Sequence, residues 1–382
     1  MSTTLKMTRQ IIWPTIIFLA ITTIGAVVGV PLYVYHHGFS WFDFNLFLIF
    51  SALTGLSITV GYHRHFSHCN YKTNRFVQFL LLFFGAGAFE MSAYDWSSLH
   101  RDHHRYVDTN DDPYSIKKGF WYAHIGWLLF WHHDIDESNV KDLQKNPLVM
   151  MQHRHFILWA SLAGVILPVA IGALFGHGLA AFLWAVCARL TFVFHSTFFI
   201  NSACHMIGKA TYDIHASAKD SWFVALITNG EGYHNFHHRF PTDYRNGIRR
   251  YDWDPSKWLI ALMARVGLAS NLQRVSNFAI MEAKLAAELE TARERLSRLG
   301  DHHEPVRLKE MLHIQYDALT LKLAEWEKSA RAYRAHLSGE MANRSVELSS
   351  AAREKMRLAR FEFDLARRRW KEFTRSREWQ TA

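Results

Sequence analysis

Four long apolar stretches limit the fold of this 382-residue chain more than any other feature. They lie near residues 11–35, 41–61, 156–176 and 179–204, and each is close to the ~20 residues that a helix needs to cross a bilayer. In lipid the backbone must satisfy its own hydrogen bonds, which a helix does without a partner. The sequence therefore predicts an all-α integral membrane protein with four transmembrane helices.

Short connections join these stretches into two hairpins, and the basic residues orient them. No Lys or Arg lies between residues 10 and 62. Cytoplasmic loops carry the excess of Lys and Arg, so both termini and the long loop after the second span are expected in the cytoplasm, with the protein in an inner or cytoplasmic membrane. A shorter apolar stretch, residues 76–89, is interpreted as an interfacial helix that leads into a cytoplasmic, histidine-rich helical cap.

The composition changes near residue 276. A membrane domain of residues 1–275 is predicted to precede a soluble helical tail of residues 276–382, rich in Glu, Arg, Ala and Leu. Within residues 285–299 and 312–337 apolar side chains alternate at spacings of three and four, which is typical of a coiled coil or a helical hairpin. An interruption is expected near residues 300–305. Self-association or packing on the membrane domain is the expected role of the tail.

Three clusters among the 24 histidines have spacings that suit metal binding. They are HRHFSH at residues 63–68, HRDHH at 100–104 and HNFHH at 234–238. Positions i, i+3 and i+4 share one face of a helix, so the histidines of the second and third clusters can each converge on one small volume. Imidazole binds iron, copper and zinc, and the supply exceeds the four ligands of one structural site, so two adjacent metals are indicated. Surface histidines without a metal are the weaker interpretation.

The clusters continue into NSACH at residues 201–205, GEGYHNFHH at 230–238 and KKGFW at 117–121. With these motifs, residues 40–275 resemble the membrane fatty-acid desaturases, in particular the stearoyl-CoA desaturase-like group. The resemblance implies two sets of iron ligands. One comprises His63, His68, His100, His104 and His237, and the other comprises His103, His205, His234 and His238, with Asn201 acting through a bound water.

The resemblance also implies the reaction. Ordinary acid–base side chains cannot break an unactivated methylene C–H bond, whereas an iron cofactor with O₂ can. An oxygen-dependent desaturase is therefore expected, which introduces a cis double bond, at the delta-9 position, into a saturated acyl chain. The two irons can be replaced by zinc on purification. The electrons would come from an external ferredoxin-, rubredoxin- or cytochrome-like donor, since the chain shows no flavin, nicotinamide or cytochrome segment.

The expected acyl tunnel has its bend at Trp96 and Thr197, by resemblance. We hypothesise that Phe47 and Ser51 in the second span close it. One departure from the family concerns the acyl donor: members that use coenzyme A carry Arg-Asp where this chain has Ser98-Leu99. Lys117 and Lys118 retain a basic pair suited to phosphates, so a long-chain acyl-CoA remains the leading expectation, with acyl chains linked to carrier protein or membrane lipid left open.

Several charged residues near the clusters have expected roles. Asp102, Asp108 and Glu231 are candidates to orient ligand imidazoles by accepting their second N–H. Arg189 lies within the fourth stretch and should face the bundle interior or the cytoplasmic lumen, because an unpaired charge in lipid is costly. The net charge of +9 fits acidic lipid or protein partners. Nucleic acid binding is excluded, because the basic residues form no groove-reading motif.

Other functions remain open at this point. A membrane hydroxylase is the nearest alternative, because oxygen rebound after the first hydrogen abstraction would give a different product from the same kind of site. A histidine-rich metal transporter would instead place its ligands near the bilayer midplane, on broken helices. A scaffold that acts mainly through its tail is the third alternative.

Overall fold

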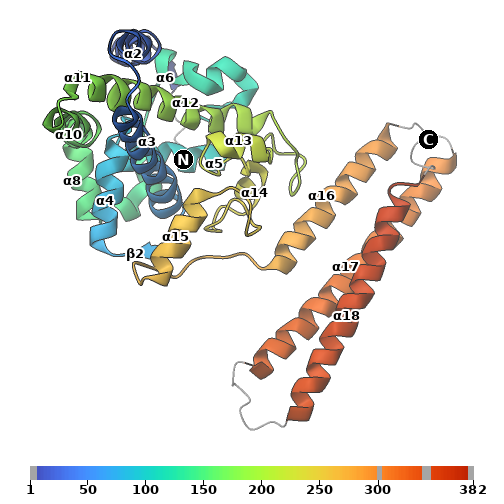
Figure 1. Cartoon of the computed structure of the whole chain (residues 1–382). Coiled ribbons are helices and arrows are strands. Elements are labelled where there is room, and N and C mark those ends of the chain that lie inside the picture. The colour runs from blue at the N-terminus through green and yellow to red at the C-terminus, as the bar shows by residue number, and fades with distance from the viewer. Residues whose placement is uncertain (1–6, 299–302, 338–345, 377–382) are drawn as a thin grey trace. The chain divides into compact units, whose positions relative to one another are not determined.

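The computed structural model describes residues 7–298, 303–337 and 346–376 (Figure 1). These residues form two compact units. The first comprises residues up to Ala210 and Ala216–Arg274, and the second combines Thr211–His215 with the chain from Val275 onward. Helices dominate both units, and the prediction of an all-α protein is confirmed.

The strands within the described residues are short and form two antiparallel pairs. In the first pair, β1 (Met7–Arg9) is joined to β3 (Trp131–His133), so the segment before the first long helix is tied to the loop after α6. In the second pair, β2 (Lys72–Thr73) is joined to β4 (Ala269–Ser270).

Four helices of the first unit are long and apolar enough to cross a membrane, which confirms the predicted number. They run over Trp13–His37, Trp41–Ser67, Phe156–Leu174 and Gly178–His205. Their successive segments are α1 (Trp13–Ile24), η1 (Gly25–Gly29) and α2 (Val30–His37); α3 (Trp41–Leu56) and η2 (Ser57–Ser67); α9 (Phe156–Ser161), η6 (Leu162–Ile166) and α10 (Leu167–Leu174); and α11 (Gly178–Ala181), η7 (Phe182–Ala188), α12 (Arg189–Asn201) and η8 (Ala203–His205).

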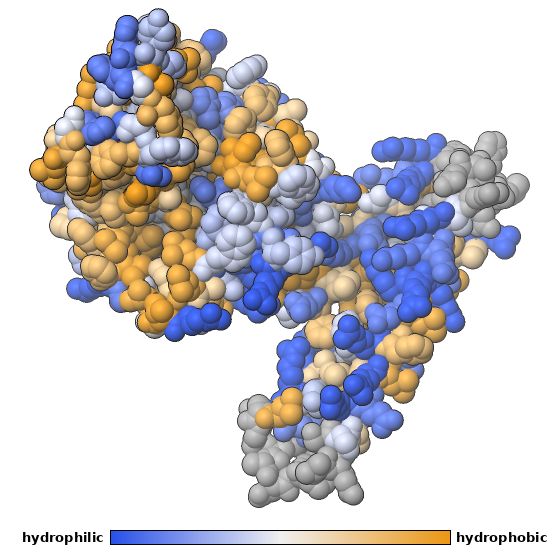
Figure 2. All heavy atoms as spheres, viewed as in Figure 1, coloured by the Kyte–Doolittle hydropathy of each residue, from blue (hydrophilic) through white to orange (hydrophobic). Residues whose placement is uncertain are grey.

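The outer surface of this bundle is apolar. On the first long helix Ile17, Ile21 and Ile24 are exposed, and on the third Ile157 and Leu174 are exposed. Figure 2 shows hydrophobic residues covering the side of the bundle near α3 and α10. Water would disfavour such a surface, whereas lipid accepts it.

Shorter helices build the cap. Their bounds are α4 (Arg75–Ala86), α5 (Ala93–Tyr106), η3 (Ile116–Lys118), η4 (Tyr122–Gly126), α6 (Trp127–Phe130), η5 (Glu137–Val140), α7 (Lys141–Gln144), α8 (Pro147–Arg154), α13 (Trp222–Ile227), α14 (His234–Arg239) and α15 (Pro255–Arg265). The Asn74 side chain caps α4 and that of Ser92 caps α5, each by accepting a backbone N–H of the first turn. The apolar face of α4 buries Val77 and Leu82, and the interfacial position predicted for this helix stays a prediction.

The second unit contains α16 (Asn277–Ser297), α17 (His303–Leu337) and α18 (Val346–Phe373). The heptad side chains identified in the sequence are used inside it: Leu285 and Leu296 of α16 pack in one core with Leu312 and Leu319 of α17. Phe363 and Trp370 of α18 complete this core. Residues 300–302 of the predicted interruption lie outside the described residues, and α17 begins at His303, so that Pro305 falls in its first turn, where proline is tolerated.

Arg189 holds three segments of the bundle together. Its fully buried guanidinium donates hydrogen bonds to the carbonyl oxygens of Gly87 (2.5 Å), Gly164 (2.6 Å) and Ala185 (2.9 Å). Gly164 cannot carry a side chain here, because an added Cβ would lie 2.6 Å from the carbonyl oxygen of Gly87, and a Cβ at Gly87 would be tight, at 3.2 Å from the backbone nitrogen of Gly164. As expected, Arg189 faces the bundle interior, and carbonyl groups rather than a carboxylate accept its hydrogen bonds.

Replacing Arg189 should therefore destabilise the bundle. Arg189→Met removes the donors to Gly87 and Gly164, and with hydrogen bonds to charged groups worth about 1.5–3 kcal/mol each, a loss of about 3 kcal/mol or more is expected. Thermal unfolding of the detergent-solubilised chain measures it, with Arg189→Lys as the partial replacement. Equal midpoints for wild type and Arg189→Met would contradict this role.

Candidate metal centre

Nine histidines gather in two groups where two of the long helices meet the helices of the cap. The first group contains His63 of η2, His68, His100 and His104 of α5 and His237 of α14; the second contains His103 of α5, His205 of η8 and His234 and His238 of α14. Within each group, one ring nitrogen per residue lies within 4.8 Å of all the others. The membership of the two groups is the one that the resemblance implied.

The ring nitrogens are spaced as ligands around a metal ion are. The Nε2 atoms of His63 and His237 are 3.0 Å apart, those of His68 and His100 2.8 Å, and those of His104 and His237 2.9 Å. Two imidazoles at right angles around an ion, each about 2.1 Å from it, would have nitrogens about 3.0 Å apart. The donor set therefore fits a metal ion in the first group.

The second group shows similar spacings. The Nε2 atoms of His234 and His238 are 3.0 Å apart, and those of His103 and His238 are 3.3 Å apart. The rings of His104 and His238 stack at 4.4 Å and so connect the two groups. Two adjacent sites can thus be held by one set of helices.

The spacing of the second and third clusters predicted only that the histidines of each can converge on one small volume, and the structure divides each cluster between the two adjacent groups. On α5, His100 and His104 join the first group while His103 joins the second. On α14, His237 joins the first group, whereas His234 and His238 join the second. Residues at i, i+3 and i+4 still span a wide arc of a helix, which is enough to reach two neighbouring sites.

Burial keeps most of these imidazoles neutral. It lowers the pKa of His68, His100 and His104 well below the ordinary value, and the neighbouring histidines lower each pKa further. The pKa values of His234 and His237 are lowered for the same reasons. A neutral imidazole has a free lone pair, as a metal ligand requires.

A buried ion network fixes the first group. Glu231 Oε2 lies 3.1 Å from His63 Nδ1, and its Oε1 lies 3.0 Å from Arg64, which also contacts Asp254 at 2.9 Å. Burial alone would raise the pKa of Glu231, but His63 and Arg64 hold it below its ordinary value. Glu231 thus lies where it can accept the second N–H of a candidate ligand, and the orienting role predicted for it stays a prediction.

A different carboxylate orients the second group. Asp112 Oδ1 lies 2.9 Å from His103 Nδ1 and is buried. Asp108 acts only indirectly: it accepts the backbone N–H of Ser217, whose hydroxyl lies 2.6 Å from His205 Nδ1. The sequence analysis missed Asp112, because it lies in the loop after α5 and not beside a histidine in the sequence.

Asp102 does not have the role suggested for it. Its Oδ1 accepts a hydrogen bond from Asn139, and it contacts no candidate ligand by hydrogen bond. The reason is geometric: Asp102 lies between His100 and His103 on α5 but points away from the face that carries them.

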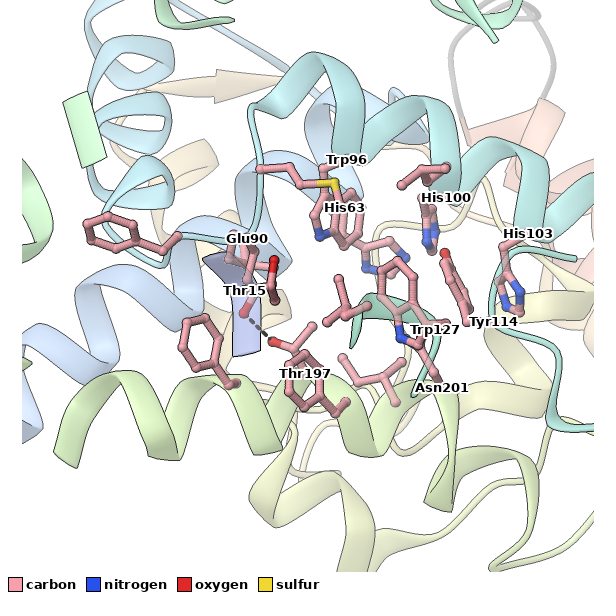
Figure 3. Close-up of a pocket in the computed structure, with 18 of the residues that line it drawn as sticks. Thr15, His63, Glu90, Trp96, His100, His103, Tyr114, Trp127, Thr197 and Asn201 are labelled. Carbon is pink, nitrogen blue, oxygen red and sulfur yellow. Dashed lines mark hydrogen bonds between the residues drawn. The ribbon is translucent and has the colours of Figure 1, made fainter. Parts of the chain in front are cut away.

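A cavity of about 450 Å³ adjoins both histidine groups (Figure 3). His63 and His100 of the first group and His103 and His234 of the second line it, and so does Asn201. Most of the remaining wall is apolar, and part of it comes from α1, at Pro14, Thr15, Phe18 and Leu19. Nothing in the sequence pattern linked α1 to the site, because the contact depends on how the bundle packs.

Trp96, Thr197 and Glu90 form one part of this wall (Figure 3). The Trp96 ring stacks on His100, with centroids 4.8 Å apart. The Thr197 hydroxyl donates to Glu90 Oε1 at 2.8 Å, whereas Glu90 Oε2 is buried without a hydrogen-bond partner among the described residues. Sequence analysis selected Trp96 and Thr197 but missed Glu90.

Four selected residues lie outside the cavity lining. Phe47 packs on the rings of Phe44, Trp184 and Phe192, and Ser51 is buried in the same helix. Lys117 is exposed in η3, and Lys118 donates to the carbonyl oxygen of Asn110. Closure of a tunnel by Phe47 and Ser51, and phosphate binding by the lysine pair, stay predictions.

The helical bundle and its two histidine groups define an integral membrane protein with a site compatible with a metal centre. The family model described as fatty acid desaturase matches residues 39–254, which is more than half of the sequence. The chain belongs to the fatty acid desaturase family.

Three relatives illustrate the match. Acyl-CoA desaturase 1 of Saccharomyces cerevisiae is 37% identical over 72% of this chain, stearoyl-CoA desaturase 4 of Mus musculus is 32% identical over 71%, and sn-1 stearoyl-lipid 9-desaturase of Anabaena variabilis is 32% identical over 69%. The aligned regions cover 56%, 78% and 94% of these relatives. The alignment with a probable acyl-CoA desaturase of Schizosaccharomyces pombe covers 48% of that protein. The chain thus spans about half the length of the two yeast proteins.

The buried carboxyl of Glu90 predicts a pH-dependent stability. Burial raises its pKa from 4.5 to about 8, against the opposing hydrogen bonds from Thr197 and Trp96. The folded chain therefore keeps this proton where the unfolded chain loses it. The neutral Glu90 carboxyl therefore contributes fully to the free energy of unfolding below pH 4.5. This contribution is lost as the pH rises towards 8, and each unit of difference between the folded and unfolded pKa corresponds to about 1.4 kcal/mol.

Glu90→Gln cannot ionise and should not show this loss. Wild type should therefore lose thermal stability relative to Glu90→Gln between about pH 5 and pH 8.5, which unfolding midpoints in detergent would measure. Parallel profiles for the two proteins would contradict a buried, neutral Glu90.

Proposed function

We propose that the chain is an oxygen-dependent fatty-acyl desaturase, which introduces a cis double bond at the delta-9 position of a saturated acyl chain and uses two histidine-held irons. The observation that carries the proposal is the pair of adjacent histidine groups opening onto one apolar cavity. Membership of the fatty acid desaturase family supports the same reaction class.

The ligand set that we propose comprises His63, His68, His100, His104 and His237 for one iron and His103, His205, His234 and His238 for the other, with Asn201 contributing through a water. The nitrogen spacings near 3 Å and the neutral, buried rings support it. When bound, the irons would supply the O₂ chemistry that removes hydrogen from a methylene group. Zinc would fit the same imidazoles.

The chain's own residues would bind and position the acyl chain. The apolar wall excludes water, and the cavity volume falls within the range of about 300–1,000 Å³ usual for ligand sites. Trp96 and His100 both line the cavity and their rings stack, so that a methylene group against the Trp96 ring would be close to the first group. The hydrogen-bonded pair of Thr197 and Glu90 supplies a polar point at which a chain would have to bend.

The acyl donor that we propose is a coenzyme A thioester, and one observation favours a second candidate. Where coenzyme A-using members carry Arg-Asp, Ser98 is fully buried and donates to the carbonyl oxygen of Asp136, while Leu99 lines the cavity. Neither presents a charge to a nucleotide. The similarity to a stearoyl-lipid desaturase makes a lipid-linked acyl chain the alternative.

Two further proposals follow from the chemistry and the charge pattern. An external ferredoxin-, rubredoxin- or cytochrome-like protein would supply the electrons. The cap would face the cytoplasm, which the absence of Lys and Arg between residues 10 and 62 supports.

The function is tested by incubating stearoyl-CoA and palmitoyl-CoA with iron-loaded membranes, a reductant and O₂. Oxygen-dependent product lighter by two hydrogens is expected from wild type, with a loss of about 100-fold or more in His104→Ala. His132→Ala is the matched control, because His132 is exposed and belongs to neither group. A product with one added oxygen would indicate a hydroxylase instead, and conversion of membrane lipid alone would replace coenzyme A as the acyl carrier.

The orienting carboxylates provide a second test. Loss of such a partner usually costs about 10–100-fold in metal affinity. Glu231→Gln and Asp112→Asn should therefore each weaken Fe²⁺ binding at one of the two sites, in titrations of the metal-free chain. Asp102→Asn is the control, because Asp102 contacts Asn139 rather than a candidate ligand. An effect of Asp102→Asn as large as that of Glu231→Gln would contradict these assignments.

A further inference from the structure

The helix α18 carries a second apolar face that the core of its own unit does not use. Leu358, Phe361 and Leu365 are 57%, 62% and 41% exposed, whereas Phe363 and Trp370 are buried. At 3.6 residues per turn, the exposed three lie roughly 150° around the helix from the buried pair. One helix thus presents two opposite faces, and only one is covered in the described structure.

The exposed face has the pattern of a coiled-coil seam. We call it the outer seam; its members are Glu354, Leu358, Phe361, Leu365, Arg368 and Glu372. Their spacings of four, three, four, three and four are those of alternating a and d positions. A seam of this kind fits another helix better than a flat surface, because its knobs need holes between side chains.

We propose that two copies of the chain associate through the outer seam, with the two α18 helices antiparallel about a two-fold axis. In this arrangement Leu358 of each copy packs beside Phe361 of the other. The contact is isologous, so every pairing occurs twice. The aliphatic part of Glu354 would cover Leu365 of the second copy.

The charges that flank the outer seam favour this arrangement over the other antiparallel register. Lys355 and Glu362 lie on one side of it, and Arg357 and Asp364 on the other. In the proposed register, Lys355 faces Glu362 of the second copy and Arg357 faces Asp364 of the second copy. Symmetry doubles both, which gives four contacts between opposite charges. Glu362 keeps its ion pair with Lys322 of α17 at the edge of the contact.

Competing arrangements bring like charges together. The other antiparallel register, with Phe361 beside Leu365 of the second copy, places Glu362 against Glu362 and Asp364 against Asp364. A parallel pair places Glu354 against Glu354 and Arg368 against Arg368 within the seam itself. Juxtaposed like charges disfavour a register by repulsion, so a second copy in the proposed register is the occupant that the sequence of α18 fits.

Three large apolar side chains per copy make a small interface, well below the roughly 1,200 Å² of a stable complex. Confinement of both copies to one bilayer raises their effective concentration and offsets this. The association is therefore expected between full chains in a membrane, and to weaken on dilution with lipid.

The test uses energy transfer between donor- and acceptor-labelled full-length chains in liposomes. Wild type should show transfer above that of randomly distributed chains, and Phe361→Ser should reduce it to the random level. Ile314→Ser is the matched control, since Ile314 is 65% exposed on α17 outside the outer seam. Transfer unchanged by Phe361→Ser, or no transfer in wild type, would overturn the proposal.

Charge exchange identifies the register. Arg357→Glu alone places a carboxylate opposite Asp364 of the second copy. Asp364→Arg alone places two guanidinium groups opposite each other. Each variant by itself should therefore lose the energy transfer between labelled chains. A mixture of the two variants should regain it, because each copy then faces an opposite charge. A parallel pair would not recover in the mixture, since the carboxylate introduced at position 357 would still face Glu362 of the second copy. Failure of the mixture, with both variants shown to be folded by circular dichroism, would overturn the antiparallel seam.

Discussion

The structure depends on holding nine buried or half-buried imidazoles close together and able to act as ligands. Their nitrogens lie within 4.8 Å of one another in each group, and burial is what lowers the pKa of most of them. Protonated rings at such distances would repel one another, so the site exists only while the cap excludes water. Every segment that carries a histidine must therefore be fixed by contacts of its own.

Two buried arginines hold several of these segments in place. Arg64 ties the second long helix to Glu231 and Asp254, and Glu231 in turn contacts His63. Arg189 ties two of the spans to the segment that follows α4, through backbone carbonyls. Both guanidinium groups are fully buried, where an unpaired charge would cost several kcal/mol, so their partners and the local backbone are constrained together.

The two units differ in what they bury and in what they expose. The first has an apolar exterior suited to lipid and a polar, histidine-rich interior at one end. The second buries its heptad side chains within a three-helix core and leaves one seam of α18 exposed. In our proposals, the first unit acts on an acyl chain and the second binds another copy of the protein.

The sequence alone determined the elements, because hydropathy and i, i+3, i+4 spacing are local properties: four spans, a helical tail and three histidine clusters. Tertiary structure decided the rest. It divided the histidines of α5 and α14 between two groups, which their spacing left open and only the family resemblance implied, brought α1 into the cavity wall, and placed Asp112 rather than Asp102 beside a histidine of the second group. Which side chain faces which site depends on helix packing between distant segments, which no local pattern records.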